Sequence, residues 1–265
     1  MKNMTWQTKT VLALLALVPI YFAIAALGTK IGLWSWQFGL GTLTIAGGPF
    51  VLGLVGLVSL VLLIMALVRK PRQGWVLPAI GVAVPAIAFL YLASTATRAA
   101  DHPIHDVATD TADPPSFSPA TIRARLQAEA NRLNNYQTPL GELEMYASSP
   151  PELAIKSHAQ IINDNYSDLS PLPLGGATRS DALAAVAAAM AGMGFQDIRT
   201  DAEAGRVEGV AETFWFGFKD DVVARIGEAE IDFRSASRVG RSDLGANADR
   251  IEELRERVAQ QIGQR

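Results

Sequence analysis

The stretch TFWFGFKDDVVARIGEAEIDFRSASRVGRSDLGAN, residues 213–247, decides how the second half of the chain folds. Charged and apolar residues alternate with a period of two over residues 221–226 and again over residues 231–238. This alternation is typical of β-strands that place one face against a core. Gly227 and Glu228 separate the two runs, which predicts a tight turn between antiparallel neighbours.

The charged residues of this hairpin have predictable directions. Arg234 and Arg238 share one face of the second strand, where they can pair with Asp221 across the sheet. Asp220 and Asp221 are adjacent on a strand, so their side chains point to opposite faces. The two carboxylates therefore do not converge, and we do not expect an acid–base dyad.

The segments around the hairpin complete a small domain. Thr178 and Asp181 fit a capping box at the start of a helix. We then expect strands over residues 195–200 and 206–218, the hairpin itself, and a last helix over residues 243–262 with one apolar face. This order predicts an α+β fold of two layers, with an antiparallel four-stranded sheet flanked by helices.

An aromatic run, Phe214, Trp215, Phe216 and Phe218, falls within the second expected strand. Consecutive large apolar side chains rarely stay exposed. We therefore expect the three phenylalanines to point into the helix layer. An exposed docking patch is the alternative interpretation.

We interpret the region before this domain as a polar connection followed by a helix and ordered loop. Residues 98–119 are polar, contain Asp-Pro-Pro and predict a tether, and a helix follows within residues 119–135. The next forty residues are expected to hold one short helix and otherwise ordered loop. We divide the chain into a membrane region, residues 1–97, the tether, and an α+β domain, residues 120–265.

Three long apolar runs, residues 10–28, 41–68 and 75–97, occupy the first third of the chain. Each can reach the roughly 20 residues that span a hydrocarbon core, so we predict three transmembrane helices. Their proline and glycine residues are compatible with membrane helices. None of the runs contains Asp or Glu, which argues against a transporter.

The positive charges predict an orientation in the membrane. They gather at the N-terminus and in the second loop, with one in the first loop: Lys2, Lys9, Arg69, Lys70, Arg72 and, alone in the first loop, Lys30. The positive-inside rule then places the N-terminus in the cytoplasm and the domain after the third helix outside it. A cleaved secretory signal in the first run is an alternative, and it leaves the domain outside as well.

Charge and cysteine content exclude several classes of protein. Residues 1–97 hold six basic and no acidic residues, whereas the remainder holds 17 basic and 26 acidic residues, a net charge of −9. An exported domain of this charge is a poor nucleic-acid binder. The chain has no cysteine, which excludes disulfides, thiolate metal sites and cysteine nucleophiles.

Three motifs carry a resemblance to a known family. FWFGFKDDVVARI followed by SASRVGRSDLGANADRI, an opening segment over residues 104–115, and YSDL at residues 166–169 resemble the bacterial and plastid family catalogued as domain of unknown function number fourteen ninety-nine. The resemblance covers residues 101–262 and brings no established activity. It implies the following motif residues: His105, Asp106, Asp110, Trp215, Asp220, Asp221, Arg234 and Asp243. From the charge pattern we expect a protein of the bacterial inner membrane, with a cytoplasmic N-terminus and a periplasmic C-terminal domain.

The candidate sites are few. Arg238, Arg241 and Ser242 precede the last helix, whose N-terminus and dipole favour an anion, and Lys219 can join them across the sheet. Internal pairing of these arginines with nearby aspartates is the alternative. His102, His105 and Asp106 are too few and too interrupted for a zinc site, so we expect neither a metal nor a cofactor.

These observations favour a binding protein over an enzyme. We expect a membrane-anchored envelope protein, held in the lipid bilayer, whose periplasmic domain binds a partner protein or an anionic envelope ligand without catalysis. The alternative is a membrane-surface enzyme that acts on a phosphorylated or lipid-linked substrate. No hydrolase, metalloprotease, nucleotide or dinucleotide motif supports the alternative.

Overall fold

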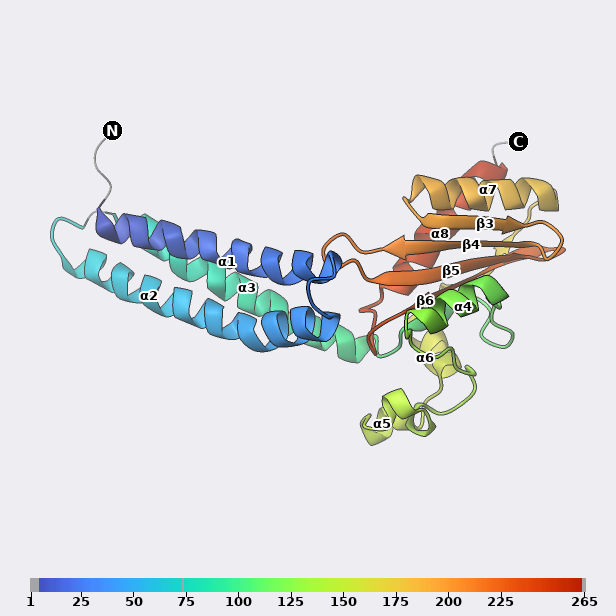
Figure 1. Ribbon diagram of the computed structural model, residues 1–265, viewed down its shortest axis with the longest axis horizontal. Helices are drawn as coiled ribbons and strands as arrows, with labels where there is room; N and C mark the ends of the chain where they lie inside the picture. The colour runs from blue at the N-terminus through green and yellow to red at the C-terminus, as the bar shows by residue number, and fades with distance from the viewer. Residues whose placement is uncertain (1–4, 73, 264–265) are drawn as a thin grey trace. The chain divides into compact units, whose positions relative to one another are not determined.

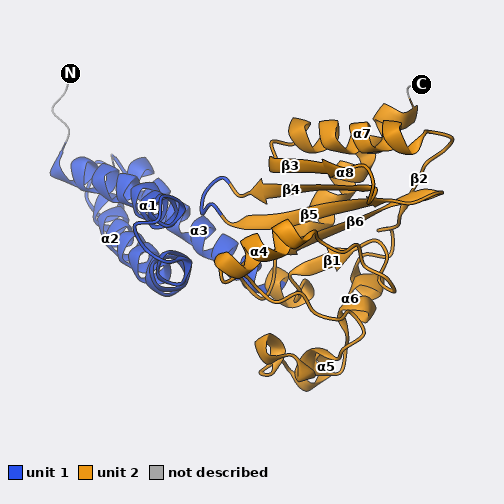
Figure 2. Ribbon diagram, turned by 45° about the vertical axis from the view of Figure 1, so that its right-hand side comes forward, with its two compact units in different colours: residues 1–97, 214–217 blue, residues 98–213, 218–265 orange. Residues whose placement is uncertain are grey.

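A computed structural model describes residues 5–72 and 74–263 of the chain. It divides into two compact units (Figure 2), one of residues 1–97 with 214–217 and one of residues 98–213 with 218–265.

The first unit is helical, as the apolar runs predict. Its elements are α1 (Trp6–Lys30), the π-helical η1 (Gln37–Gly47), α2 (Gly48–Val68) and α3 (Val76–Asp101), whose last residues belong to the second unit. Three helical spans are long and apolar enough to cross a membrane: Trp6–Lys30, Gln37–Val68 and Val76–Asp101. The helices lie side by side (Figure 1), and the three predicted apolar helices are confirmed.

Small residues let these helices approach closely. A Cβ added to Gly81 of α3 would lie 2.5 Å from the hydroxyl oxygen of Ser59 on α2 and 3.0 Å from a methyl group of Val11 on α1. Only glycine therefore fits at this crossing. Most other apolar side chains of the three helices face outward, as expected of surfaces that contact lipid.

The second unit is built on an antiparallel sheet with strand order β1-β6-β5-β4-β3, and β2 also pairs with β6. The strands are β1 (Asp106–Ala108), β2 (Leu172–Pro173), β3 (Gln196–Asp201), β4 (Arg206–Glu212), β5 (Lys219–Ile226) and β6 (Glu230–Ser237). The predicted hairpin is β5–β6. The prediction of four strands is wrong, because β1 and β2 add to the free edge of β6 one after the other.

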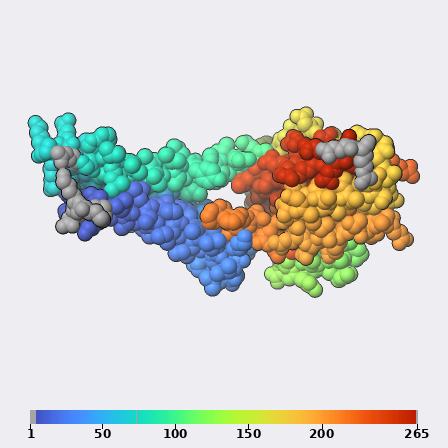
Figure 3. All heavy atoms as spheres, turned by 90° about the horizontal axis from the view of Figure 1, so that it is seen from above, coloured from blue at the N-terminus to red at the C-terminus, as the bar shows by residue number. Residues whose placement is uncertain are grey.

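Helices cover both faces of this sheet. The helices of the second unit are α4 (Pro119–Gln127), α5 (Pro151–Ala154), α6 (His158–Asn165), α7 (Arg179–Gly192) and α8 (Ala246–Gly263), with short 3-10 turns η2 (Leu140–Glu142) and η3 (Glu144–Tyr146). Of these, α5 lies away from the sheet (Figure 1). The helices α7 and α8 lie side by side at the surface (Figure 3) and cover one face with the main core. A smaller core of Phe117, Val223 and Ala236 lies on the other face, where α4 is found. The layer of α4 is an addition to the predicted two layers.

Adjacent residues of β5 follow the expected alternation. Val222 and Ala224 belong to the core under α7 and α8, whereas Val223 belongs to the core on the α4 side. Asp220 accepts a hydrogen bond from Arg250 of α8, and Asp221 accepts one from Arg125 of α4. The prediction that these two carboxylates face opposite sides is confirmed.

The aromatic run differs from the prediction. Strand β4 ends at Glu212, and residues 213–218 form a turn rather than a continuation of the strand. Phe214 is 73% exposed and Trp215 is 55% exposed, whereas Phe216 and Phe218 are half-buried. The expected burial of Phe214 is therefore wrong, and Gly217, with φ of +67°, provides the physical reason by turning the chain.

The segment expected to be a tether, residues 98–119, is largely structured. It contains the end of α3 and strand β1, and residues 103–109 are buried. Thr178 caps α7 by accepting a hydrogen bond from the backbone of Asp181, which is one half of the predicted capping box. The helix expected over residues 119–135 ends earlier, at Gln127.

Candidate functional site

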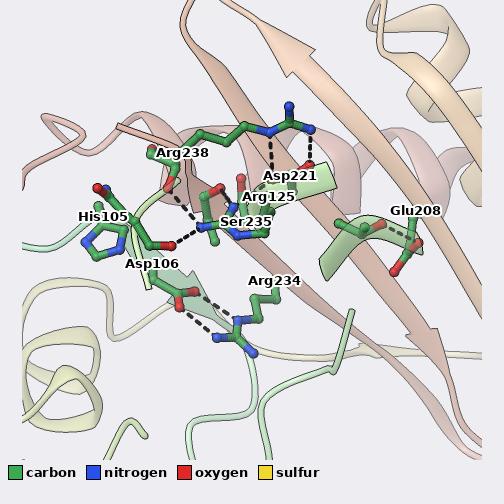
Figure 4. Close-up of polar contacts among 12 residues, drawn as sticks. His105, Asp106, Arg125, Glu208, Asp221, Arg234, Ser235 and Arg238 are labelled. Atoms are coloured by element: carbon green, nitrogen blue, oxygen red, sulfur yellow. Dashed lines mark hydrogen bonds and ion pairs between the residues drawn. The ribbon is translucent and has the colours of Figure 1, made fainter. Parts of the chain in front are cut away.

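A buried ion pair joins the first and last strands of the second unit. Arg234 of β6 donates two hydrogen bonds to Asp106 of β1, of 2.9 and 2.7 Å (Figure 4). Tyr136 donates a third, of 2.6 Å, to the same carboxylate. Burial opposes ionisation of Asp106, but the charge and hydrogen bonds of Arg234 outweigh it and lower the pKa of Asp106 to about 2.

A second buried carboxylate, Asp221, binds two arginines. Arg125 of α4, itself buried, donates to Asp221 at 2.7 Å and also to the carbonyl of Ala236. Arg238 donates two hydrogen bonds to Asp221, of 3.0 and 2.7 Å (Figure 4). Asp221 is thus the link between α4 and the end of β6.

Two more charged residues of β5, Asp220 and Arg225, are paired as well. Asp220 accepts from Arg250 at 2.7 Å. Arg225 donates to Asp232, Asp110 and Asp113 at distances of 2.6–3.1 Å. The expectation that these charges form cross-strand and local ion pairs therefore describes the structure, although the partner of Arg234 is Asp106 rather than Asp221.

A cluster of histidines and tyrosines lies beside this network. His105 shares a hydrogen bond of 2.8 Å with Tyr146, whose hydroxyl donates to the carbonyl of Arg241. His158 stacks on Tyr136 with ring centroids 5.5 Å apart. Both histidines are fully buried, and burial lowers the pKa of His105 to about 4 and lowers the pKa of His158. They are neutral core groups at neutral pH.

Three buried ring nitrogens of the histidine cluster lack a hydrogen-bond partner among the described residues. Neither ring nitrogen of His158 has a hydrogen-bond partner among the described residues, and Nε2 of His105 has none either. Within residues 5–72 and 74–263, no three His, Asp or Glu side chains are grouped so as to hold a metal ion. The cluster has the geometry of a packed core rather than of a reaction centre.

An open groove of about 930 Å³ lies at the start of the second unit. Its apolar lining includes Pro103, Leu153 and Ile161, and its basic lining residues are Lys156 and Arg241. Glu152 and Asp101 add acidic groups. The lining of the groove therefore combines apolar side chains with charges of both signs.

Arg241 is the exposed guanidinium of this groove. It lies over the ring of Tyr146, 5.5 Å from the centroid, and donates to the hydroxyl of Ser149 at 2.9 Å. No ion pair joins Arg241 to a carboxylate in the part of the chain that the structure describes. Its charge is therefore held in place yet left available to an anion.

The four predicted anion-binding residues are not brought to one point. Arg238 binds Asp221, and Lys219 is exposed at the start of β5. Ser242 lines the groove with Arg241, but its hydroxyl donates to the carbonyl of His102 at 2.6 Å. Asp243 accepts from the backbone N–H groups of Gly245 and Asn247, and so occupies the N-terminus of α8 as a cap.

The family-motif residues mostly belong to the buried network. Asp106, Asp220, Asp221 and Arg234 pair within it, and His105 lies beside it. Asp110 accepts from the backbone of Ala112 and from Arg225, whereas Asp243 accepts from backbone N–H groups. Trp215 differs because it is exposed on a turn. Sequence reasoning missed five residues that complete these sites: Arg125, Tyr136, Tyr146, His158 and Lys156.

Fold and site together define a protein with three candidate membrane helices and an α+β domain braced by buried ion pairs. The chain belongs to the family described as protein of unknown function (DUF1499), which matches residues 106–258, more than half of its length. No curated protein and no solved structure gives a significant match.

Proposed function

We propose that this chain is a membrane-anchored envelope protein whose domain binds a partner protein through the groove beside Arg241. The observation that supports it most is the exposed guanidinium, fixed on Tyr146 and Ser149 and without a carboxylate partner among the described residues. Arginine in such a setting favours a carboxylate or phosphate through two parallel hydrogen bonds.

A protein segment fits the groove better than a bare anion does. Leu153 and Ile161 offer apolar contacts next to Arg241, as in sites that combine an apolar base with a few polar groups. Glu152 and Asp101 make an isolated phosphate a weaker ligand at Arg241 than a peptide carboxylate, because they can also bind basic or amide groups of the peptide. We propose an extended segment with one acidic residue that meets Arg241.

Catalysis is not part of this proposal. Ser242, the hydroxyl of the groove, bonds to the carbonyl of His102 and accepts from the backbone of Leu244, so it serves the local turn. The ring of His102 shares a hydrogen bond with Tyr166 rather than with this hydroxyl. No observation in the described residues favours the alternative of a membrane-surface enzyme.

The periplasmic location is likewise our proposal. The three apolar helices support association with a membrane. The basic residues at the N-terminus and at 69–72 support a cytoplasmic N-terminus and an exported domain. A bacterial inner membrane is part of the same proposal.

Site-directed photocrosslinking in cells tests the groove. A photoreactive residue at Glu152, which is exposed and lines the groove, should form one discrete protein adduct. Arg241→Glu should abolish the adduct, whereas the control Arg257→Glu, on the exposed side of α8, should leave it intact. A lipid adduct would instead assign the groove to an anionic lipid. An adduct that persists in Arg241→Glu would contradict the role of this arginine.

A further inference from the structure

The turn between β4 and β5, residues 213–218, carries an aromatic tip that the groove does not involve. Phe214 and Trp215 are mostly exposed, and their rings contact edge to face at a centroid distance of 5.1 Å. Two adjacent large aromatic side chains are rarely left in water without a use.

The turn is closed at its base, so the tip has a defined conformation. The backbone N–H of Thr213 donates to the carbonyl of Phe218 at 2.8 Å, and the backbone N–H of Phe218 donates to the hydroxyl of Thr213 at 2.9 Å. Gly217 adopts φ of +67°, which reverses the chain between them. Little conformational entropy is therefore lost when the tip is bound.

The register of the sheet shows which end of the domain bears this turn. Asp106 of β1 and Asp221 of β5 both lie opposite Ala236 of β6, one on each side of it. Both strands are antiparallel to β6, so both begin at the same end of the sheet. The turn leaves the sheet at the end where the chain enters from α3.

Chain length keeps that end close to the bilayer. Five residue steps separate Asp101, the last residue of α3, from Asp106, a reach of at most about 18 Å. The 26 residues of α3 exceed the roughly 20 that span hydrocarbon by about 9 Å of helix. The short connection from α3 would not hold an aromatic turn at the opposite end of the sheet close to the bilayer.

We propose that Phe214 and Trp215 insert into the headgroup region of the bilayer that holds the apolar helices, as a second anchor of the domain. Tryptophan and phenylalanine are suited to this region, where an apolar ring meets water and headgroups. Lys219, exposed one residue after the turn, adds a charge that lipid phosphates attract. This contact fixes how the domain is presented at the membrane surface.

The absence of cysteine from the chain allows a direct test in the full-length protein. Single variants Phe214→Cys and Ala204→Cys would be labelled with an environment-sensitive fluorophore and reconstituted in phosphatidylcholine–phosphatidylglycerol vesicles. Ala204 is the matched control, because it is exposed in the β3–β4 connection at the other end of the sheet.

Spin-labelled lipid should quench the label at 214 several-fold more than the label at 204, and iodide should show the reverse order. Adding Trp215→Ser to Phe214→Cys should weaken quenching by lipid. Equal quenching at the two positions would overturn the proposal. Strong quenching by iodide at 214 would overturn it as well, and is the result expected if the tip binds a partner protein that the vesicles lack. Arg241→Glu should leave the quenching unchanged, which separates this test from that of the groove.

Discussion

Asp106 and Arg234 lie 128 residues apart in the sequence and form a two-hydrogen-bond ion pair in the interior of the domain. The pair joins the first strand after the apolar helices to the last strand of the sheet. Tyr136, the third partner, comes from the long connection between them. One buried carboxylate thus gathers three distant segments.

Removing one partner of this pair should destabilise the domain strongly. Arg234→Met leaves the carboxylate of Asp106 buried without its counter-charge, which costs about 3–5 kcal/mol. The measurement is denaturant unfolding of the full-length protein in detergent. Arg257→Met is the control, because Arg257 pairs with Glu253 on an exposed helix face, where such pairs contribute less than about 1 kcal/mol. Equal effects of the two substitutions would contradict a structural role for Arg234.

Periodicity predicted those parts of the fold whose contacts are local. The apolar helices, the hairpin of β5 and β6 and the capped start of α7 follow from patterns within one segment. The opposite directions of Asp220 and Asp221 also follow from the pleat alone. Each of these features is decided by neighbours in the sequence.

The features missed depend on distant partners. Strand β1 has three residues, too few to show a period, and exists because it pairs with β6. The pairing of Arg234 with Asp106 could not be predicted, because the sequence offers many acidic residues as partners for each arginine. For the aromatic turn a local signal was present: Gly217 interrupts the run, and the left-handed conformation it adopts is incompatible with a continuous strand.

Acid should weaken the domain in two steps. The folded pKa of His105, about 4, lies below its ordinary value of 6.5, so the unfolded chain binds a proton first and stability falls as the pH drops from 6.5 to about 4. Asp106 behaves likewise at lower pH, between 3.8 and about 2. Thermal unfolding across this range should show the first loss reduced in His105→Gln. A His105→Gln variant with the same pH dependence between 6.5 and 4 would contradict the assignment.

The core and the aromatic tip should respond differently to truncation. Phe233 is fully buried in the core under α7 and α8, so Phe233→Ala should cost about 3–5 kcal/mol. Trp215→Ala removes an exposed side chain and should change stability by less than about 1 kcal/mol. Both values can be measured by denaturant unfolding in detergent, without lipid. A large effect of Trp215→Ala would show that the turn supports the fold.

The proposed orientation can be checked with reporter fusions. Alkaline phosphatase fused after residue 265 should be active, because it requires export, and a fluorescent protein that matures only in the cytoplasm should be dark there. Both reporters fused within residues 69–72 should give the reverse result, since the basic residues of that loop favour the cytoplasm. Inverted activities at the two sites would refute the orientation and the proposed compartment together.

Alanine substitutions of the two arginines before α8 should affect the melting temperature differently, because one arginine has a structural role and the other is proposed to bind a ligand. Arg238 holds Asp221 with two hydrogen bonds, so Arg238→Ala should lower the melting temperature with or without added anions. Arg241 has no carboxylate partner among the described residues, so Arg241→Ala should leave the melting temperature nearly unchanged.

Inorganic phosphate, used as the probe, should raise the melting temperature of the unaltered protein. This stabilisation should be lost in Arg241→Ala and kept in Arg257→Ala, because only the first residue lines the groove. Arg238→Ala should start from a lower melting temperature yet retain the shift with phosphate. If phosphate stabilises neither the unaltered protein nor Arg238→Ala, Arg241 is not an anion site, and the groove would have to bind its partner through Leu153 and Ile161 alone.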